Sequence, residues 1–230
     1  MNALASLIRA EIEEAGPIRF SRFMELALYH PALGYYENRR PVGRHGDYYT
    51  SVSAGGLFGE LLAFTFDEWR VAANGQPLQI VEGGAHEGRL ANDILEWCRD
   101  WGNKSEVEYW ILEPSGARQA WQRDTLAAWH PHVHWAQGWD DLPASAGPRI
   151  IVANELLDAM PVERWGWDAT ARDWFEWGVG AARDRFVWVR LGPARPTGEP
   201  GAARGPHPLG DRFPLDADLL AVLPDGFVVE

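Results

Sequence analysis

The chain has 230 residues, of which 46% are hydrophobic and 23% are charged, a composition typical of a globular protein and not of a disordered one. Its formal net charge of −12 argues against non-specific binding to nucleic acid, because phosphates attract surfaces rich in Lys and Arg. A single cysteine, Cys98, excludes an intrachain disulfide, and the absence of Cys/His clusters with zinc-ligand spacing predicts no metal site.

The N-terminal sequence "MNALASLIRAEIEEAG" is amphipathic and acidic. It lacks the cationic start of a secretory signal and the Arg-rich, acid-poor character of a transit peptide. No apolar run in the chain approaches the roughly 20 residues that span a bilayer. We therefore expect a cytoplasmic protein without a membrane partner.

Helices and one long loop are predicted in the first 75 residues. Apolar residues at helical spacing predict a first helix that Gly16 ends, and Ser21 is predicted to cap a second. Residues 30–56 are rich in turn residues, and loops of this length are usually functional or disordered. Their tyrosines favour order. A strong amphipathic helix is then predicted from about Phe58 to about Arg70.

Strands and helices alternate through residues 76–162. Short apolar strands are predicted at "LQIVEGG", "VEYWILEP", "VHWAQGW" and "PRIIVA", and the fourth is predicted to run into a helix. This alternation is typical of βαβ units and predicts an α/β fold with a parallel sheet.

The sequence changes character after Val162. It alternates, with Gly and Asp breaks, which predicts antiparallel hairpins, and residues 192–210 are rich in Pro and Gly and are predicted to be mobile. We therefore expect three parts: N-terminal helices with a cofactor-covering loop (1–75), a Rossmann-like core (76–162) and a substrate-side hairpin insert (163–230).

A glycine-rich turn, "EGGAHEG", follows the first parallel strand, where ligands of such sheets lie beyond the carboxyl ends of the strands. Gly84 and Gly88 would let backbone approach a ligand, but the dinucleotide fingerprint G-x-G-x-x-G is absent. Glu82, which opens the turn, suits a cofactor with a cationic end and no phosphates, such as S-adenosylmethionine. Its carboxylate would hold the ammonium group directly or through water. An ordinary tight turn is the alternative.

Three further segments are expected near this turn. Glu113 ends the second strand, close to the roughly 20-residue offset at which an acidic side chain binds ribose hydroxyls. Asn154 and Glu155 end the fourth strand, and "GDYYTS" (46–51) carries side chains able to fold over a ligand. Each also has a purely structural interpretation, as a strand-terminal acid, a helix cap or a turn.

Taken in order, five segments resemble the MidA-type S-adenosylmethionine-dependent methyltransferases, a family that includes the mitochondrial arginine methyltransferase assisting assembly of respiratory complex I. They are "GPIRFSRFMELALYHPALGYY", "GRHGDYYTSVSAGGLFGELLAFTFDEW", "IVEGGAHEGRLANDIL", "ILEPSGARQAWQ" and "VANELLDAMPVERW". The resemblance implies a class I, Rossmann-like methyltransferase sheet with an N-terminal helical extension and an antiparallel hairpin insert. It also implies S-adenosylmethionine as cofactor and a protein substrate presenting arginine.

The resemblance carries cofactor-binding roles onto nine positions of this sequence: Gly46, Asp47, Thr50, Ser51, Glu82, Gly84, Gly88, Glu113 and Asn154. Glu155 and Asp158 match the segment that faces cofactor and substrate. They stand at i and i+3 of the predicted helix after the fourth strand, which would place both on one face to orient a cationic acceptor. Stabilisation of the helix N-terminus or a surface ion pair is the alternative role of this pair.

The chain departs from the family pattern in two ways. His86 replaces the middle glycine of the turn, where an imidazole would either crowd the methionine end of the cofactor or turn outward. The chain also stops at "LPDGFVVE", where the family continues with a helix, a fifth strand and a final antiparallel pair. Without those strands one side of the sheet is expected to be exposed, which favours aggregation or pairing with another chain.

These observations predict an S-adenosylmethionine-dependent methyltransferase acting on arginine of a protein. Two alternatives stay open: methylation of a small molecule, and a non-catalytic binding module in which His86 weakens the cofactor site. The sequence identifies neither the acceptor nor the oligomeric state.

Overall fold

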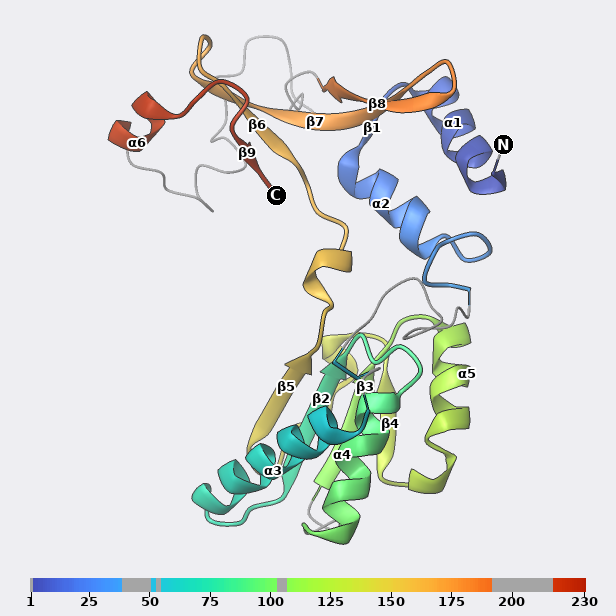
Figure 1. Ribbon diagram of the computed structural model, residues 1–230, viewed down its shortest axis with the longest axis vertical. Helices are drawn as coiled ribbons and strands as arrows, with labels where there is room; N and C mark the ends of the chain where they lie inside the picture. Colours follow the sequence, from blue (N-terminus) through green and yellow to red (C-terminus); the bar gives the residue numbers. More distant parts are fainter. Residues whose placement is uncertain (1, 39–50, 53–54, 103–106, 192–216) are drawn as a thin grey trace. The chain divides into compact units, whose positions relative to one another are not determined.

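The structure is a computed structural model that describes residues 2–38, 51–52, 55–102, 107–191 and 217–230 (Figure 1). The chain forms two compact units, one of Met1–Tyr36 with Met160–Glu230 and the other of Glu37–Ala159. The N-terminal segment 1–75 is therefore shared between the units. Among the described residues, no helix combines the length and the apolar character needed to cross a bilayer.

The unit Glu37–Ala159 contains a parallel sheet with the strand order β4-β3-β2-β5. The strands are β2 (Leu78–Gly83), β3 (Val107–Leu112), β4 (Val133–Ala136) and β5 (Arg149–Ala153), and every pairing between them is parallel. These strands coincide with the four predicted apolar runs. The predicted α/β fold with a parallel sheet is thus confirmed.

Helices α3 (Leu57–Ala72), α4 (Arg89–Asp100) and α5 (Gly116–Thr125) belong to the same unit, with short 3-10 helices η3 (Ala127–Trp129) and η4 (Trp139–Asp141). Ile80 and Tyr109 of the sheet are completely buried in a core with Phe66 of α3, Ile94 of α4 and Leu126 beyond α5. The helices therefore supply the apolar cover for this face of the sheet.

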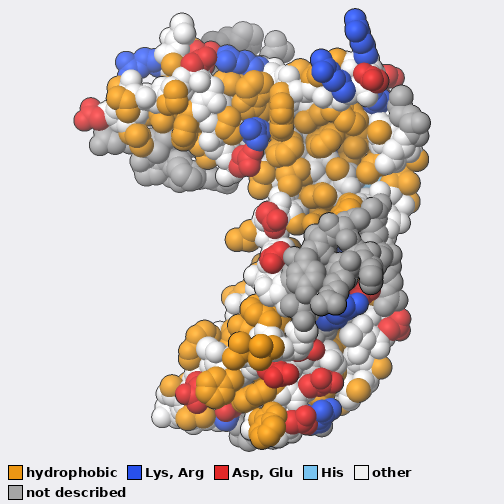
Figure 2. Space-filling model, viewed as in Figure 1, with side chains coloured by type: hydrophobic (Ala, Val, Ile, Leu, Met, Phe, Trp, Pro, Cys, Tyr) orange, Lys and Arg blue, Asp and Glu red, His pale blue; other side chains and the backbone are white. Residues whose placement is uncertain are grey.

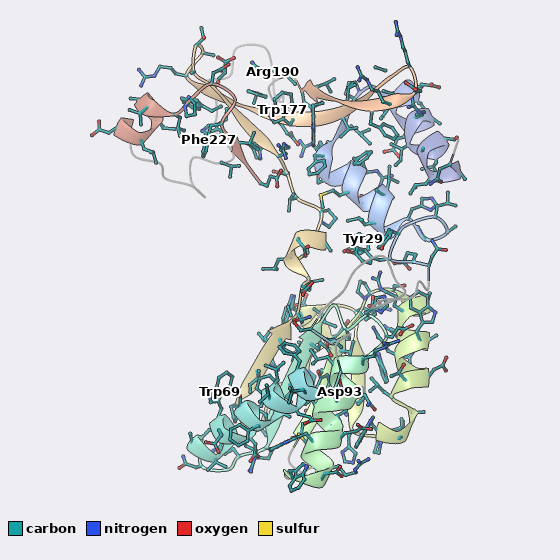
Figure 3. The ribbon with its side chains drawn as sticks, in the orientation of Figure 1. Tyr29, Trp69, Asp93, Trp177, Arg190 and Phe227 are labelled. Atoms are coloured by element: carbon teal, nitrogen blue, oxygen red, sulfur yellow. The ribbon has the colours of Figure 1, made fainter. Side chains whose placement is uncertain are left out.

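Helices α3 and α4 pack closely because the sequence provides a glycine at their contact. A Cβ atom on Gly59 would lie 2.5 Å from Cβ of Asp93, which is labelled on α4 in Figure 3. No larger residue fits at Gly59 without separating the two helices. The outer side of α3 carries exposed large apolar side chains (Figure 2), namely Leu57, Leu61, Phe64, Trp69 and Val71.

Strand β5 stands at the end of the described strand order, and its side chains alternate between two environments. Ile150 and Val152 pack against the core, whereas Ile151, which points to the opposite face, is 61% exposed. The exposed side of the sheet expected from the sequence, and the aggregation or pairing inferred from it, stay predictions.

The other unit contains antiparallel strands and two helices near its N-terminus. The helices are α1 (Ala3–Ala15) and α2 (Phe20–Tyr29), and α6 (Ala217–Val222) lies near the C-terminus. The strands are β1 (Ile18–Arg19), β6 (Trp165–Asp168), β7 (Asp173–Ala182), β8 (Arg185–Arg190) and β9 (Val228–Val229), and all their pairings are antiparallel. The predicted hairpins after Val162 are confirmed, whereas residues 192–210, which were predicted to be mobile, lie outside the described residues.

The first helix ends at Gly16, as predicted, and Gly16 has a φ of 83°. The prediction that Ser21 caps α2 is wrong, because the helix begins one residue earlier, at Phe20. Arg19 is extended because it pairs with Gly178 of β7, so the helix starts directly where that pairing ends.

The tryptophans of the hairpins pack against other aromatic side chains of the same unit. Trp167 contacts Trp174 with ring centroids 5.2 Å apart, and Trp177 contacts Trp188 at 6.4 Å. Trp177 of β7 lies opposite Arg190 of β8, and both are labelled in Figure 3. These tryptophans therefore contribute to the packing of the hairpins.

Candidate cofactor site

The register of the parallel sheet brings three predicted segments to one edge. Gly83 at the end of β2 pairs with Leu112 of β3 on one side and with Ala153 of β5 on the other. Glu113 and Asn154 follow these two partners directly in the chain. The turn after β2 therefore begins between them, at the carboxyl ends of the strands, where ligands of such sheets bind.

The turn after β2 depends on glycine for its conformation and for close packing. Gly84 and Gly88 have φ values of 73° and 83°, and Gly88 leads directly into α4. A Cβ atom on Gly84 would lie 2.9 Å from Cδ1 of Leu156, and one on Gly88 would lie 2.9 Å from Cδ1 of Leu126. Leu156 thus packs the segment after β5 directly against the turn.

Gly84→Ala is expected to destabilise the protein by roughly 2 kcal/mol, because it combines a left-handed backbone with a clash against Leu156. Urea unfolding followed by tryptophan fluorescence measures this loss. In the double variant with Leu156→Ala, the loss should be smaller than the sum of the two single losses, because the clash is removed. Stability equal to the parent protein would contradict the prediction.

The Glu82 side chain points into the core and not outward from the turn. Its Oε2 accepts a hydrogen bond from the Tyr109 hydroxyl at 2.8 Å, and Glu82 is 2% exposed. Loss of hydration on burial raises the pKa of Glu82 to about 7, against the opposing effect of the Tyr109 hydrogen bond. The predicted contact of this carboxylate with an ammonium group stays a prediction.

The Glu113 carboxylate is surrounded by donors from the helix that follows it. Its Oε1 accepts hydrogen bonds from the Ser115 backbone N–H and from Nη2 of Arg118, both at 2.8 Å. Its Oε2 accepts from Nε of Arg118 at 2.9 Å and from Nε2 of Gln122 at 3.3 Å. This paired, two-point contact with a guanidinium fixes the plane of the carboxylate.

A second carboxylate joins this group from a distant part of the same unit. Glu37 Oε1 accepts from Nη1 of Arg118 at 2.7 Å, and its Oε2 accepts from the Ser115 hydroxyl at 2.7 Å. The side chains of Glu37, Arg118 and Glu113 are 9%, 11% and 3% exposed. One buried guanidinium therefore bridges two buried carboxylates.

The sequence analysis missed Glu37, Arg118, Gln119 and Gln122. On α5, Arg118 and Gln122 stand one turn apart and share a buried face with Leu126. Polar side chains at i and i+4 that continue into an apolar position are the signal that could have identified them. Gln122 is fully buried, donates to the His86 carbonyl at 3.1 Å and accepts from the Trp135 indole at 2.9 Å.

The helix predicted after the fourth strand is not formed, so that prediction is wrong. Only a three-residue 3-10 helix, η5 (Leu157–Ala159), follows β5, and Glu155 precedes it with a φ of 50°. This left-handed residue interrupts any helix started at Asn154, and Pro161 follows shortly after η5. Glu155 and Asp158 are both exposed, but they do not share the face of a regular helix.

The structure describes only some of the remaining predicted residues. Ser51 lies in an exposed turn, whereas Gly46, Asp47 and Thr50 lie outside the described residues. Asn154 is half-buried. Over the described ranges, no group of three or more His, Cys, Asp or Glu side chains is placed to hold a metal ion.

His86→Gly is expected to leave cofactor affinity unweakened. His86 has a φ of 48°, a conformation that glycine adopts readily, and its contact with Gln122 uses the backbone carbonyl. Calorimetric titration with S-adenosylhomocysteine checks this. A marked loss of affinity would show that the imidazole itself contributes to binding.

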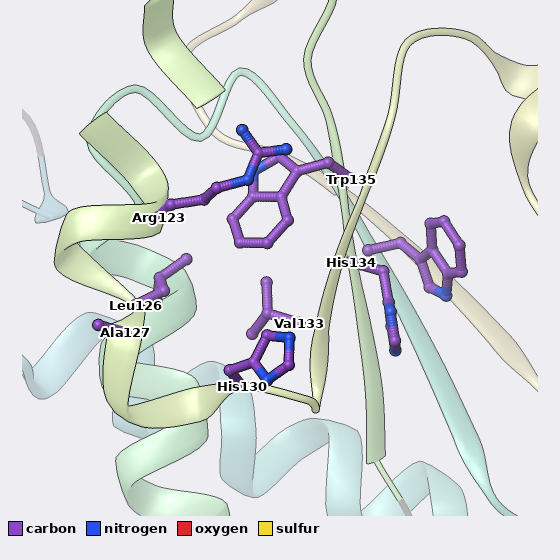
Figure 4. Close-up of a pocket in the computed structure, with 8 residues that line it drawn as sticks. Arg123, Leu126, Ala127, His130, Val133, His134 and Trp135 are labelled. Carbon is purple, nitrogen blue, oxygen red and sulfur yellow. The ribbon is translucent and has the colours of Figure 1, made fainter. Parts of the chain in front are cut away.

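A cavity of about 650 Å³ lies beside β4, away from the predicted cofactor residues (Figure 4). It is lined by Trp110, Arg123, Leu126, Ala127, His130, Val133, His134 and Trp135. None of the predicted site residues belongs to this lining, although Leu126 also packs against Gly88 of the glycine turn. Arg123 lies over the Trp135 ring at 4.7 Å, so its guanidinium is already engaged.

The chain is similar to curated animal proteins over most of its length. It is 32% identical over 183 residues to the protein arginine methyltransferase NDUFAF7 homolog, mitochondrial, of Drosophila melanogaster, covering 70% of this chain and 41% of that protein. It is 29% identical over 187 residues to the protein arginine methyltransferase NDUFAF7, mitochondrial, of Xenopus tropicalis, covering 71% and 43%. The chain thus spans less than half the length of these relatives.

A crystal structure from Burkholderia thailandensis with bound S-adenosyl-homocysteine is similar in fold, with a TM-score of 0.68 and 36% sequence identity. The similarity covers 84% of this chain and 51% of that one, and it confirms the class I methyltransferase fold. Residues 61–204 match the family described as "Putative S-adenosyl-L-methionine-dependent methyltransferase". The chain therefore belongs to this S-adenosyl-L-methionine-dependent methyltransferase family.

Proposed function

We propose that this chain binds S-adenosylmethionine and takes part in methyl transfer to arginine of a protein. The single observation that carries the proposal is the convergence of the glycine turn, Glu113 and Asn154 at one edge of the parallel sheet. The bound S-adenosyl-homocysteine in the similar crystal structure supports the choice of cofactor.

The chemistry of the candidate site fits a cofactor without phosphates. Arg89, the first residue of α4, pairs with Glu87 at 3.0 Å, so this cation next to the turn is already matched by a carboxylate. Glu113 supplies a buried carboxylate after the neighbouring strand. A carboxylate there suits ribose hydroxyls.

Each residue of the proposed site has a distinct part. The cofactor supplies an activated methyl group on its sulfonium. Glu113 would accept hydrogen bonds from the ribose hydroxyls, and Asn154 would bind the amino-acid end of the cofactor. The turn through Gly84 and Gly88 would let the backbone approach it. Alignment of donor and acceptor away from bulk water is the main requirement of such an in-line transfer.

Arginine as acceptor is supported by the names of the animal relatives and by the acidity of the segment after β5. A guanidinium has a pKa above about 12 and must be oriented and relieved of a proton during methylation. We propose Glu155 and Asp158 for this role through their separate, exposed positions, without the helical face first expected. The net charge of −12 favours a basic substrate and disfavours nucleic acid.

Two measurements test the proposal. Calorimetry with S-adenosylhomocysteine should give saturable binding, and incubation of a cell lysate with the protein and labelled S-adenosylmethionine should transfer label to arginine of a protein. Label on a small molecule would favour the alternative acceptor. No heat and no thermal shift at millimolar cofactor would favour the non-catalytic binding module.

The compartment is a separate proposal. We propose the cytoplasm as the compartment, whereas the names of the animal relatives include the word mitochondrial. Fractionation of the source cells with an antibody to the protein would decide between the two.

A further inference from the structure

Helix α5 points a polar, buried face toward the ends of β2 and β3. Arg118 and Gln122 both bond the Glu113 carboxylate, and Gln119 donates to the Glu113 backbone carbonyl at 2.7 Å. Gln122 also bonds the His86 carbonyl in the glycine turn at 3.1 Å. One helix face therefore contacts both segments to which the cofactor is assigned.

The acceptor positions of Glu113 are fully used in this arrangement. A carboxylate has about four in-plane acceptor positions, and four donors occupy them here. The longest of these bonds, at 3.3 Å, comes from Gln122, whose amide also donates to His86. Gln122 is therefore the donor that a ribose hydroxyl would displace at the smallest cost.

Arg118 is held much more firmly than Gln122. It donates twice to Glu113, at 2.8 and 2.9 Å, and once to Glu37, at 2.7 Å. The two-point contact with the guanidinium thus fixes the plane of the Glu113 carboxylate, and with it the direction of the acceptor position that Gln122 occupies.

We propose that Arg118 is a positioning residue for ribose recognition: it holds the Glu113 carboxylate in a fixed orientation, while Gln122 is the partner that the ribose exchanges. Glu37 anchors the guanidinium from the other side, so Arg118 stays in place when Glu113 takes up the hydroxyl. This inference depends on the proposed function, because it concerns the same cofactor. A purely structural Arg118 would affect all ligands equally.

The test compares S-adenosylhomocysteine with its 2′,3′-dideoxy analogue by calorimetry. The parent protein should prefer the hydroxylated ligand by at least about tenfold, the size expected for hydrogen bonds to a charged group. Arg118→Met should weaken binding of S-adenosylhomocysteine about tenfold while changing affinity for the analogue little, so that the preference collapses. Arg118→Lys keeps the charge but not the two-point contact, and the preference should fall there too.

Arg123→Met is the matched control, because it makes the same change on the same helix. Arg123 contacts Gln119 and the Trp135 ring, but no bond to Glu113 is found for it within the described residues. The preference should be unchanged in this variant. Thermal unfolding and far-UV circular dichroism verify that each variant is folded. If the Met variant is unfolded, the Lys variant decides by the same ratio of affinities.

The outcomes separate this inference from the proposed function. A preserved preference in folded Arg118 variants, or an equal loss for both ligands, would overturn the positioning role and leave the methyltransferase proposal standing. A parent protein that binds neither ligand would overturn the proposed function, and the positioning role with it.

Discussion

Glu113→Ala should abolish binding of S-adenosylhomocysteine, and Glu113→Gln should weaken it by at least about tenfold. The carboxylate is proposed to accept a ribose hydroxyl in exchange for Gln122, and a hydrogen bond to a charged group is worth about 1.5–3 kcal/mol. The amide of glutamine offers one acceptor oxygen in place of two and carries no charge. Calorimetric titration of each variant measures the loss, and unchanged affinity would remove Glu113 from the ribose role.

The same variants should also lower the free energy of unfolding, by about 2 kcal/mol. Arg118 would lose one of its two buried carboxylate partners and keep only Glu37. Glu108→Ala is the control for cofactor binding, since Glu108 lies on the strand that precedes Glu113 and its side chain is 46% exposed. That control should retain cofactor affinity.

The sheet could be predicted because each strand has a local sequence pattern that is typical of a strand. "LQIV" and "RIIV" are short, mainly apolar runs of the length of a strand, and the intervening helices carry regular apolar faces. Gly84 and Gly88 indicated a tight turn after the first strand, and both have positive φ values in the structure. Once the strands were parallel, the placement of Glu113 and Asn154 at one edge followed from topology alone.

The errors arose where distant parts of the chain decide the local structure. The start of α2 is set by pairing of Arg19 with Gly178, which no local pattern near Ser21 records. Likewise, the contact between Glu37 and Arg118 joins residues 81 positions apart. Arg118 therefore looked like an ordinary charge on a surface helix, although the fold buries it.

In the segment after β5, the local sequence pattern predicts a helix, but packing against the glycine turn prevents that helix from forming. "NELLDAM" has good helix formers and a plausible cap at Asn154, but Leu156 packs against Gly84 and Glu155 turns left-handed. The segment therefore packs against the glycine turn and does not form the predicted helix. The proposed substrate carboxylates consequently lie on an irregular segment, where sequence spacing does not indicate which side chains share a face.

Glu82→Gln should stabilise the protein at pH 8 but not at pH 5. Burial raises the pKa of Glu82 to about 7, whereas an unfolded glutamate titrates near about 4.3. Between these values the folded state keeps a proton that the unfolded state releases, so the contribution of Glu82 to stability falls as the pH rises. Above about pH 7 the folded protein contains a buried, charged carboxylate beside Tyr109.

Glutamine removes that charge while its carbonyl oxygen still accepts the Tyr109 hydroxyl hydrogen bond at this site. Urea unfolding at pH 8 should therefore show a gain of roughly 1–3 kcal/mol over the parent protein, and a difference near zero at pH 5. Tyr109→Phe is the companion variant. It removes a hydrogen bond that supports the charged form, so it should destabilise the protein more at pH 8 than at pH 5. Equal effects at the two pH values in both variants would mean that Glu82 does not titrate between pH 5 and pH 8. The buried side chain would then be either ionised or neutral throughout this range.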